Sequence, residues 1–116
     1  FNELMRPSMY GSYHQISLLP ADGGERQHKP TVVAGPLCES GDVFTQADGG
    51  VVTPRDLPAA QVGDLMVFHD TGAYGASMSS NYNSRPLAAE VLIDGDSHRL
   101  IRKKQTVEAL LQLEDC

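Results

Sequence analysis

Short apolar runs, separated by Gly- and Asp-rich turns, are the main pattern along the chain. The turns fall at Pro20–Gly24, Ala47–Gly50, Thr71–Gly75 and Asp94–Ser97. Apolar and β-branched residues dominate the segments between these turns, which is typical of strands. We therefore predict strands over Tyr13–Leu19, Pro30–Gly35, Val51–Pro54, Asp64–Asp70, Ala88–Asp94 and His98–Lys104. Short strands between such turns favour a mainly β fold, either a barrel or a sandwich.

Two local signals refine this pattern near the end of the chain. The last two predicted strands should form a hairpin, because the Asp-Gly-Asp sequence at 94–96 tolerates the positive φ of a tight turn. One helix is predicted over Thr106–Glu114, where Val107, Leu110 and Leu111 fall at helical spacing and Thr106 can cap the first turn.

The composition limits the class of protein. A chain of 116 residues with 41% hydrophobic content fits one globular domain, and no apolar run approaches the roughly 20 residues that cross a bilayer. The net charge of −6 argues against a nucleic-acid partner. No signal peptide is visible, and two cysteines do not make a disulfide framework, so we expect a reducing cytoplasm and an inert thiol at Cys116. The abrupt start, FNELMRPSMY, leads us to expect a piece of a longer protein.

The loop Gly35–Asp42, GPLCESGD, concentrates reactive groups in one place. Its Gly-Pro pair ends a strand, and Gly41 gives the backbone conformational freedom at the other end of the loop. The loop can therefore present Cys38, Glu39 and Ser40 outward on a rigid frame. Positive charge near a thiol favours release of its proton, which makes such a cysteine a ready proton donor or nucleophile. The alternative is that Cys38 is a small buried apolar residue and Glu39 is simply solvated.

Two other segments carry candidate ligand-binding side chains. Arg6 and Tyr10 could bind a carboxylate through a guanidinium fork and a phenol hydroxyl, the alternative being a surface ion pair and a core tyrosine. Because Arg6 precedes Pro7, we expect its backbone to be extended. Tyr74 is flanked by glycines within the polar segment His69–Pro86, which predicts a binding loop, with a flexible surface loop as the alternative.

The sequence contains no recognisable motif for the common catalytic, nucleotide-binding or metal-binding sites. There is no serine triad, no Walker loop and no dense Cys or His cluster for zinc. The histidines lack metal-site spacing, and His69 is expected to be structural. Chemistry alone therefore predicts a small β domain with polar, ligand-facing loops and no metal.

Taken together and in this order, five segments resemble the C-terminal domain of the diaminopimelate decarboxylases: RPSMY, GPLCESGD, GAYGASMSSNYNSRP, AEVLIDG and RLIRKKQTVEALL. The resemblance runs from Phe1 nearly to Cys116, and CESGD after Gly-Pro is its most specific part. It implies a pyridoxal-phosphate enzyme of the alanine-racemase-like fold, in which a (β/α)8 barrel holds the cofactor and its Schiff-base lysine. Residues 1–116 would be the second domain, a small Greek-key-like β-barrel with a short C-terminal helix.

The barrel domain itself is absent from this sequence. Lys29, Lys103 and Lys104 stand in no context that resembles the Schiff-base lysine. The family's small domain also takes a short segment from the start of the parent chain, so an edge strand here is expected to be unpaired. The resemblance therefore implies that this chain alone is inactive.

The resemblance also implies a role for each candidate residue. Cys38 matches the proton donor, which reaches into the active site of the partner subunit of a homodimer. Glu39 matches the carboxylate that contacts the amino group at the distal end of the substrate. Arg6 and Tyr10 match residues that bind the substrate's distal carboxylate. Tyr74 matches a tyrosine placed at both the cofactor and the substrate, on the opposite protomer from Cys38.

The implied reaction converts meso-2,6-diaminopimelate to L-lysine and CO2, a step of lysine biosynthesis. The pyridinium ring of the cofactor takes up the electrons left at the α carbon, and a general acid then returns a proton, a contribution of about 10²–10⁴ in rate. An arginine paired with the distal carboxylate discriminates against substrates that lack this group.

Three alternatives remain open at this point. Decarboxylases of ornithine, arginine or lysine share the fold, but those acting on ornithine and arginine tend to carry aspartate after the cysteine, so Glu39 favours diaminopimelate. A non-catalytic binding module would not need Cys38. A free-standing thiol enzyme would need a histidine placed to activate that thiol.

Overall fold

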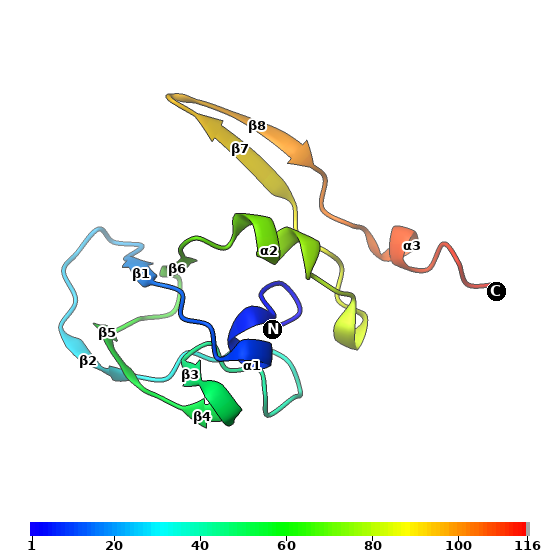
Figure 1. Cartoon of the computed structure of the whole chain (residues 1–116). Helices are drawn as coiled ribbons and strands as arrows, with labels where there is room; N and C mark the ends of the chain where they lie inside the picture. Colours follow the sequence, from blue (N-terminus) through cyan, green and yellow to red (C-terminus); the bar gives the residue numbers. More distant parts are fainter. Residues whose placement is uncertain (116) are drawn as a thin grey trace.

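The computed structural model describes residues 1–115, in which short strands outnumber helices (Figure 1). The strands are β1 (Ile16–Leu19), β2 (His28–Thr31), β3 (Gln46–Ala47), β4 (Val51–Val52), β5 (Arg55–Pro58), β6 (Leu65–Phe68), β7 (Glu90–Asp94) and β8 (Ser97–Arg102). The helices are α1 (Arg6–Tyr10), α2 (Gly72–Ser77) and α3 (Val107–Leu110), with 3-10 turns at η1 (Asp48–Gly50) and η2 (Tyr82–Ser84). The mainly β prediction is confirmed. Cys116, for which an inert thiol was expected, lies outside the described residues.

The strands pair antiparallel in four two-stranded ladders: β1 with β6, β2 with β5, β3 with β4 and β7 with β8. The predicted hairpin is confirmed, since Asp94 pairs with Ser97 around a two-residue turn in which Gly95 has φ +59°. β1 also lies against β5, which brings the first two ladders together. Within residues 1–115 the ladders do not join into one hydrogen-bonded ring, so strand edges remain open.

The apolar core is small and lies where these first two ladders meet. Ile16 of β1, Leu57 of β5 and Val33 are buried, and the rings of Phe44 and Phe68 pack beside them with centroids 4.6 Å apart. Few apolar side chains are fully buried, so the core stabilises only this part of the chain.

Two predictions about the local backbone were wrong. Arg6 is not extended but is the first residue of α1, and Pro7 follows in the first helical turn, where its missing N–H leaves no hydrogen bond unmade. The glycine-flanked segment around Tyr74 is not a loop but the helix α2. Both helices are only five or six residues long, so contacts with the rest of the molecule, rather than propensity, hold them.

The chain exposes more surface than a compact protein of its size. Its accessible surface is 8183 Å², whereas a compact 12.5 kDa protein exposes about 6,200 Å². The excess, about 2,000 Å², is larger than the roughly 800 Å² that one partner contributes to a stable protein–protein interface. The Cα radius of gyration of 16.0 Å likewise exceeds the roughly 13 Å expected for this length.

The hairpin of β7 and β8 is one of the most exposed parts of the described chain. Figure 1 shows this hairpin standing apart from β1–β6, with α3 leading away at the other end. Its apolar side chains are exposed on both faces: Val91, Leu92, Ile93, Leu100 and Ile101. As for membrane spans, no helix within residues 1–115 is long and apolar enough to cross a bilayer.

Candidate functional site

A short stem presents the loop that carries Cys38 and Glu39. Its two sides are held by backbone hydrogen bonds, from the Gly35 N–H to the Asp42 carbonyl (2.8 Å) and from the Phe44 N–H to the Val33 carbonyl (2.8 Å). The ends of the loop are thus fixed to the edge of the core.

A buried carboxylate closes the base of this loop. Asp42 is only 2% exposed, and its Oδ2 accepts a hydrogen bond from the Leu37 N–H (2.9 Å) while its Oδ1 accepts one from the Phe1 nitrogen. A side chain at Gly35 would collide with this carboxylate, so any larger residue there would have to displace it. The glycine and the carboxylate together define where the loop turns.

Helix α1 supports the loop from the other side. The Ser8 hydroxyl donates to the Gly41 carbonyl (2.6 Å), and the buried Gln46 amide donates to the Val43 carbonyl (2.6 Å) and to the Ser8 Oγ (3.2 Å). These contacts form a rigid frame, as the sequence predicted, although neither Ser8 nor Gln46 was singled out.

The two reactive side chains of the loop differ in exposure. Cys38 is an exposed free thiol, which rules out the alternative of a buried apolar cysteine. Glu39 is half-buried, and both of its oxygens are hydrogen-bonded: Oε1 accepts from the Gly41 N–H (3.1 Å) and the Ser40 hydroxyl (3.3 Å), and Oε2 accepts from the Tyr82 hydroxyl (3.2 Å). The Gly41 N–H and then the Tyr82 hydroxyl lower the pKa of Glu39 below its ordinary 4.5, so the side chain is an anion at neutral pH.

The second group of candidate residues meets at α1 and α2. The guanidinium carbon of Arg6 lies 4.9 Å from the centre of the Tyr74 ring, in cation–π geometry. Arg6 Nη1 also lies 3.5 Å from Nε2 of His14, a buried residue whose Nδ1 lies 3.0 Å from the His69 carbonyl. The carbonyl can only accept, so Nδ1 carries the hydrogen and Nε2 is left to accept from Arg6.

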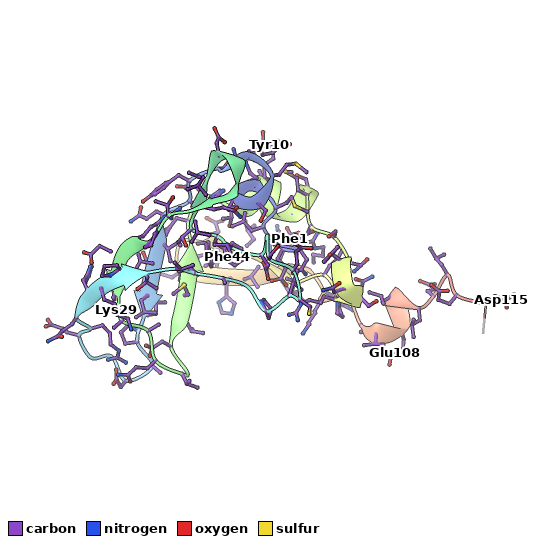
Figure 2. The ribbon with its side chains drawn as sticks, turned by 90° about the horizontal axis from the view of Figure 1, so that it is seen from below. Phe1, Tyr10, Lys29, Phe44, Glu108 and Asp115 are labelled. Atoms are coloured by element: carbon purple, nitrogen blue, oxygen red, sulfur yellow. The ribbon has the colours of Figure 1, made fainter. Side chains whose placement is uncertain are left out.

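Tyr10 stands apart from these contacts. It is 56% exposed, four residues after Arg6 on the same helix, and Figure 2 shows it at the outer edge of the molecule. The structure thus joins Arg6 with Tyr74, and Glu39 with Tyr82, while Tyr10 faces solvent. The partners Tyr82 and His14 were missed, although Tyr82 lies in the segment NYNSRP and His14 follows YGSY.

Two of the candidate side chains lie where they could contact a bound cofactor. Tyr74, 55% exposed, and Arg6 beside it can reach a bound molecule. Lys29, Lys103 and Lys104 are exposed on or beside strands. Residues 1–115 contain no group of three His, Cys, Asp or Glu side chains able to hold a metal ion.

Comparison with known protein families gives a match over more than half of the chain. Residues 1–72 match the family described as "Pyridoxal-dependent decarboxylase, C-terminal sheet domain". The chain belongs to this family. The resemblance to a decarboxylase C-terminal domain is therefore confirmed, and the matched part of this decarboxylase domain includes Arg6, the loop with Cys38 and Glu39, and the start of α2.

Known relatives of this decarboxylase domain are much longer than the chain itself. The diaminopimelate decarboxylase of Escherichia coli (strain K12) is 68% identical over 98% of the chain, and that of Streptomyces coelicolor is 66% identical over 98%. A crystal structure of a diaminopimelate decarboxylase superposes with a TM-score of 0.95 at 66% identity, and that of the Helicobacter pylori enzyme complexed with L-lysine with 0.81 at 37%. The chain covers 28%, 26%, 28% and 26% of these four proteins, so it spans about a quarter of the length of its relatives.

Proposed function

We propose that the chain is the C-terminal domain of a pyridoxal-phosphate-dependent decarboxylase that converts meso-2,6-diaminopimelate to L-lysine and CO2. The observation that carries this proposal is an exposed thiol, Cys38, beside a carboxylate, Glu39, whose two oxygens are both held by hydrogen bonds. This pair offers a proton donor next to a fixed anion. The 68% identity to an enzyme named for this substrate supports the assignment.

The charges of the site suit the distal end of this substrate. Diaminopimelate differs from lysine by a second carboxylate, which sits beside its second ammonium group. The Glu39 anion binds the ammonium, and the Arg6 guanidinium binds the carboxylate. The Tyr10 hydroxyl, one helical turn from Arg6 and exposed to solvent, is free to donate to the same carboxylate. An analogue without that carboxylate would leave Arg6 unpaired, and this penalty supplies the discrimination.

The proton step belongs to Cys38. Pyridoxal phosphate, when bound, takes up the electron pair left at the α carbon as CO2 departs. The Cys38 thiol then gives its proton to that carbon and regains one from solvent. Tyr74, with Arg6 on its ring, contacts the substrate and the edge of the cofactor.

The remaining parts of the site must come from other polypeptide segments. We infer a (β/α)8 barrel in the same polypeptide, which supplies the Schiff-base lysine and the phosphate site, and a second subunit that receives Cys38 at a dimer interface. The excess surface of about 2,000 Å² supports such partners. A free thiol and a biosynthetic reaction also favour a cytoplasmic location.

The test is made on the full-length protein. We expect Cys38→Ala to lower kcat by about 10²–10⁴ while the absorbance of the bound cofactor is unchanged, because only the general acid is lost. Cys116→Ala is the matched control and should keep full turnover. Unchanged turnover in Cys38→Ala would contradict the proposal and favour a binding module.

The substrate and the domain boundary need separate measurements. The full-length protein should turn over meso-diaminopimelate faster than ornithine, and the opposite order would show that it acts on another amino acid. The isolated chain should lose pyridoxal phosphate on gel filtration, and a cofactor absorbance that survives would contradict the inferred barrel site.

A further inference from the structure

The segment after α2 contains an unusually strained turn, η2. Asn83 and Ser84 both have φ +55°, in the left-handed region that residues other than glycine rarely occupy. The turn is fixed by Asn81, whose side-chain amide donates to the Arg85 carbonyl (2.9 Å) and to Gln105 Oε1 (2.6 Å). Two successive strained residues persist only where their surroundings hold them, and such strain is often found at functional sites.

The strained turn presents one side chain to the loop that carries Glu39. The hydroxyl of Tyr82, in the first position of η2, donates to Glu39 Oε2 across 43 residues of sequence, and the Tyr82 ring packs on Phe1 with centroids 5.0 Å apart. Tyr82 is 42% exposed, so this pair lies at the surface, where a ligand can reach it.

Tyr82 completes the restraint of the Glu39 carboxylate. The Gly41 N–H and the Ser40 hydroxyl bind Oε1, and without the tyrosine no hydroxyl would fix Oε2. A carboxylate has about four lone-pair positions, so each oxygen can accept these hydrogen bonds and still accept from an ammonium group. The contact also raises the pKa of Tyr82 above its ordinary 10.0, which keeps the phenol protonated as a donor.

We propose that Tyr82 is a positioning residue: it orients Glu39 for the distal ammonium group of the substrate and so sets substrate affinity rather than the rate of proton return. This inference rests on the proposed function, in which Glu39 binds that ammonium. Tyr82 takes no part in the proton transfer assigned to Cys38, because its hydroxyl acts on the substrate only through the Glu39 carboxylate.

The first experiment removes only the hydroxyl. In the full-length protein, Tyr82→Phe keeps the ring against Phe1, and it should raise KM for meso-diaminopimelate about three- to tenfold while kcat changes less than twofold, a modest effect because the hydrogen bond is partly solvated. Tyr13→Phe is the matched control. The guanidinium carbon of Arg55 lies 4.1 Å from the centre of the Tyr13 ring, and Tyr13 is 72% exposed. Tyr13 makes no contact with Glu39, so KM should not change.

A double-mutant cycle then tests whether the hydroxyl acts through Glu39. Glu39→Gln should raise KM by itself, and adding Tyr82→Phe should change KM less than twofold further, because the anion that the hydroxyl positions is gone. A tyrosine with a merely structural role would lower activity equally in both backgrounds.

The outcomes separate this inference from the proposed function. If Glu39→Gln leaves KM unchanged, the assignment of Glu39 fails and this inference fails with it. If Glu39→Gln raises KM but Tyr82→Phe leaves it unchanged, or if the two effects multiply independently, only the role of Tyr82 is overturned. A fall in kcat alone in Tyr82→Phe would also overturn it.

Discussion

One buried hydroxyl supports the stem beneath the Cys38 loop in addition to its two backbone hydrogen bonds, and this contribution can be tested. Thr45 is fully buried, and its Oγ1 accepts the hydrogen bond of the Val33 N–H at 3.0 Å, joining the two sides of the stem. Thr45→Val keeps the volume but removes the acceptor, leaving a buried N–H unpaired at a cost of about 1–3 kcal/mol.

Hydrogen exchange on the full-length protein measures this cost locally. If the stem opens as a unit, 1–3 kcal/mol corresponds to amide exchange about 5- to 150-fold faster in the peptides that span Val33–Thr45. Turnover should fall as well, because Cys38 and Glu39 lose their fixed frame.

Thr45→Ser is the matched control for that experiment. It keeps the acceptor and loses one buried methyl group, worth about 1 kcal/mol, so its exchange should lie closer to the unsubstituted protein. If Thr45→Ser exchanges faster than Thr45→Val, packing rather than the hydrogen bond holds the stem, and our reasoning is refuted.

Three further substitutions test the core, the loop base and the acid response. Leu57→Ala should lower the free energy of unfolding by about 2–5 kcal/mol in chemical denaturation, and no loss would contradict the core we describe. Gly35→Ala places a methyl group against the Asp42 carboxylate, so we expect about 1–3 kcal/mol lower stability and a reduced kcat. Full activity would show that Asp42 can move aside without disturbing the loop. The Ala21 N–H, with other donors, lowers the pKa of Asp64 below its ordinary 3.8 in the folded state, so its stabilisation is present above that pH and is lost as pH falls through the folded value. Asp64→Asn should therefore flatten the acid-unfolding curve below about pH 4, whereas the exposed control Asp96→Asn should follow the unsubstituted protein.

The parts of the fold that could be predicted are those whose signal is local. Apolar runs marked β1 and β6, the Asp-Gly turn marked the β7–β8 hairpin, and Thr106 caps α3 as expected, with its Oγ1 accepting from the Ala109 N–H at 3.1 Å. Strand β5 escaped prediction because only Leu57 in it is buried and its other residues are charged or proline. Helix α2 escaped because its two glycines argue against a helix.

The candidate site divides in the same way. Cys38 and Glu39 are adjacent in sequence, so the loop that presents them could be predicted from one short motif. The contact of Glu39 with Tyr82 spans 43 residues and depends on the strained turn η2, and nothing in the local sequence specifies it. The pairing of Arg6 with Tyr74 likewise depends on how α1 and α2 pack.

The hairpin of β7 and β8 has a practical consequence for anyone who produces this domain by itself. Two strands with unpaired N–H and C=O groups along their outer edges, and with Ile93 74% exposed near the tip, form a template on which further copies can add strand by strand. Recombinant residues 1–116 will therefore tend toward self-association and precipitation, and a lysine at Ile93 is the simplest remedy for solubility.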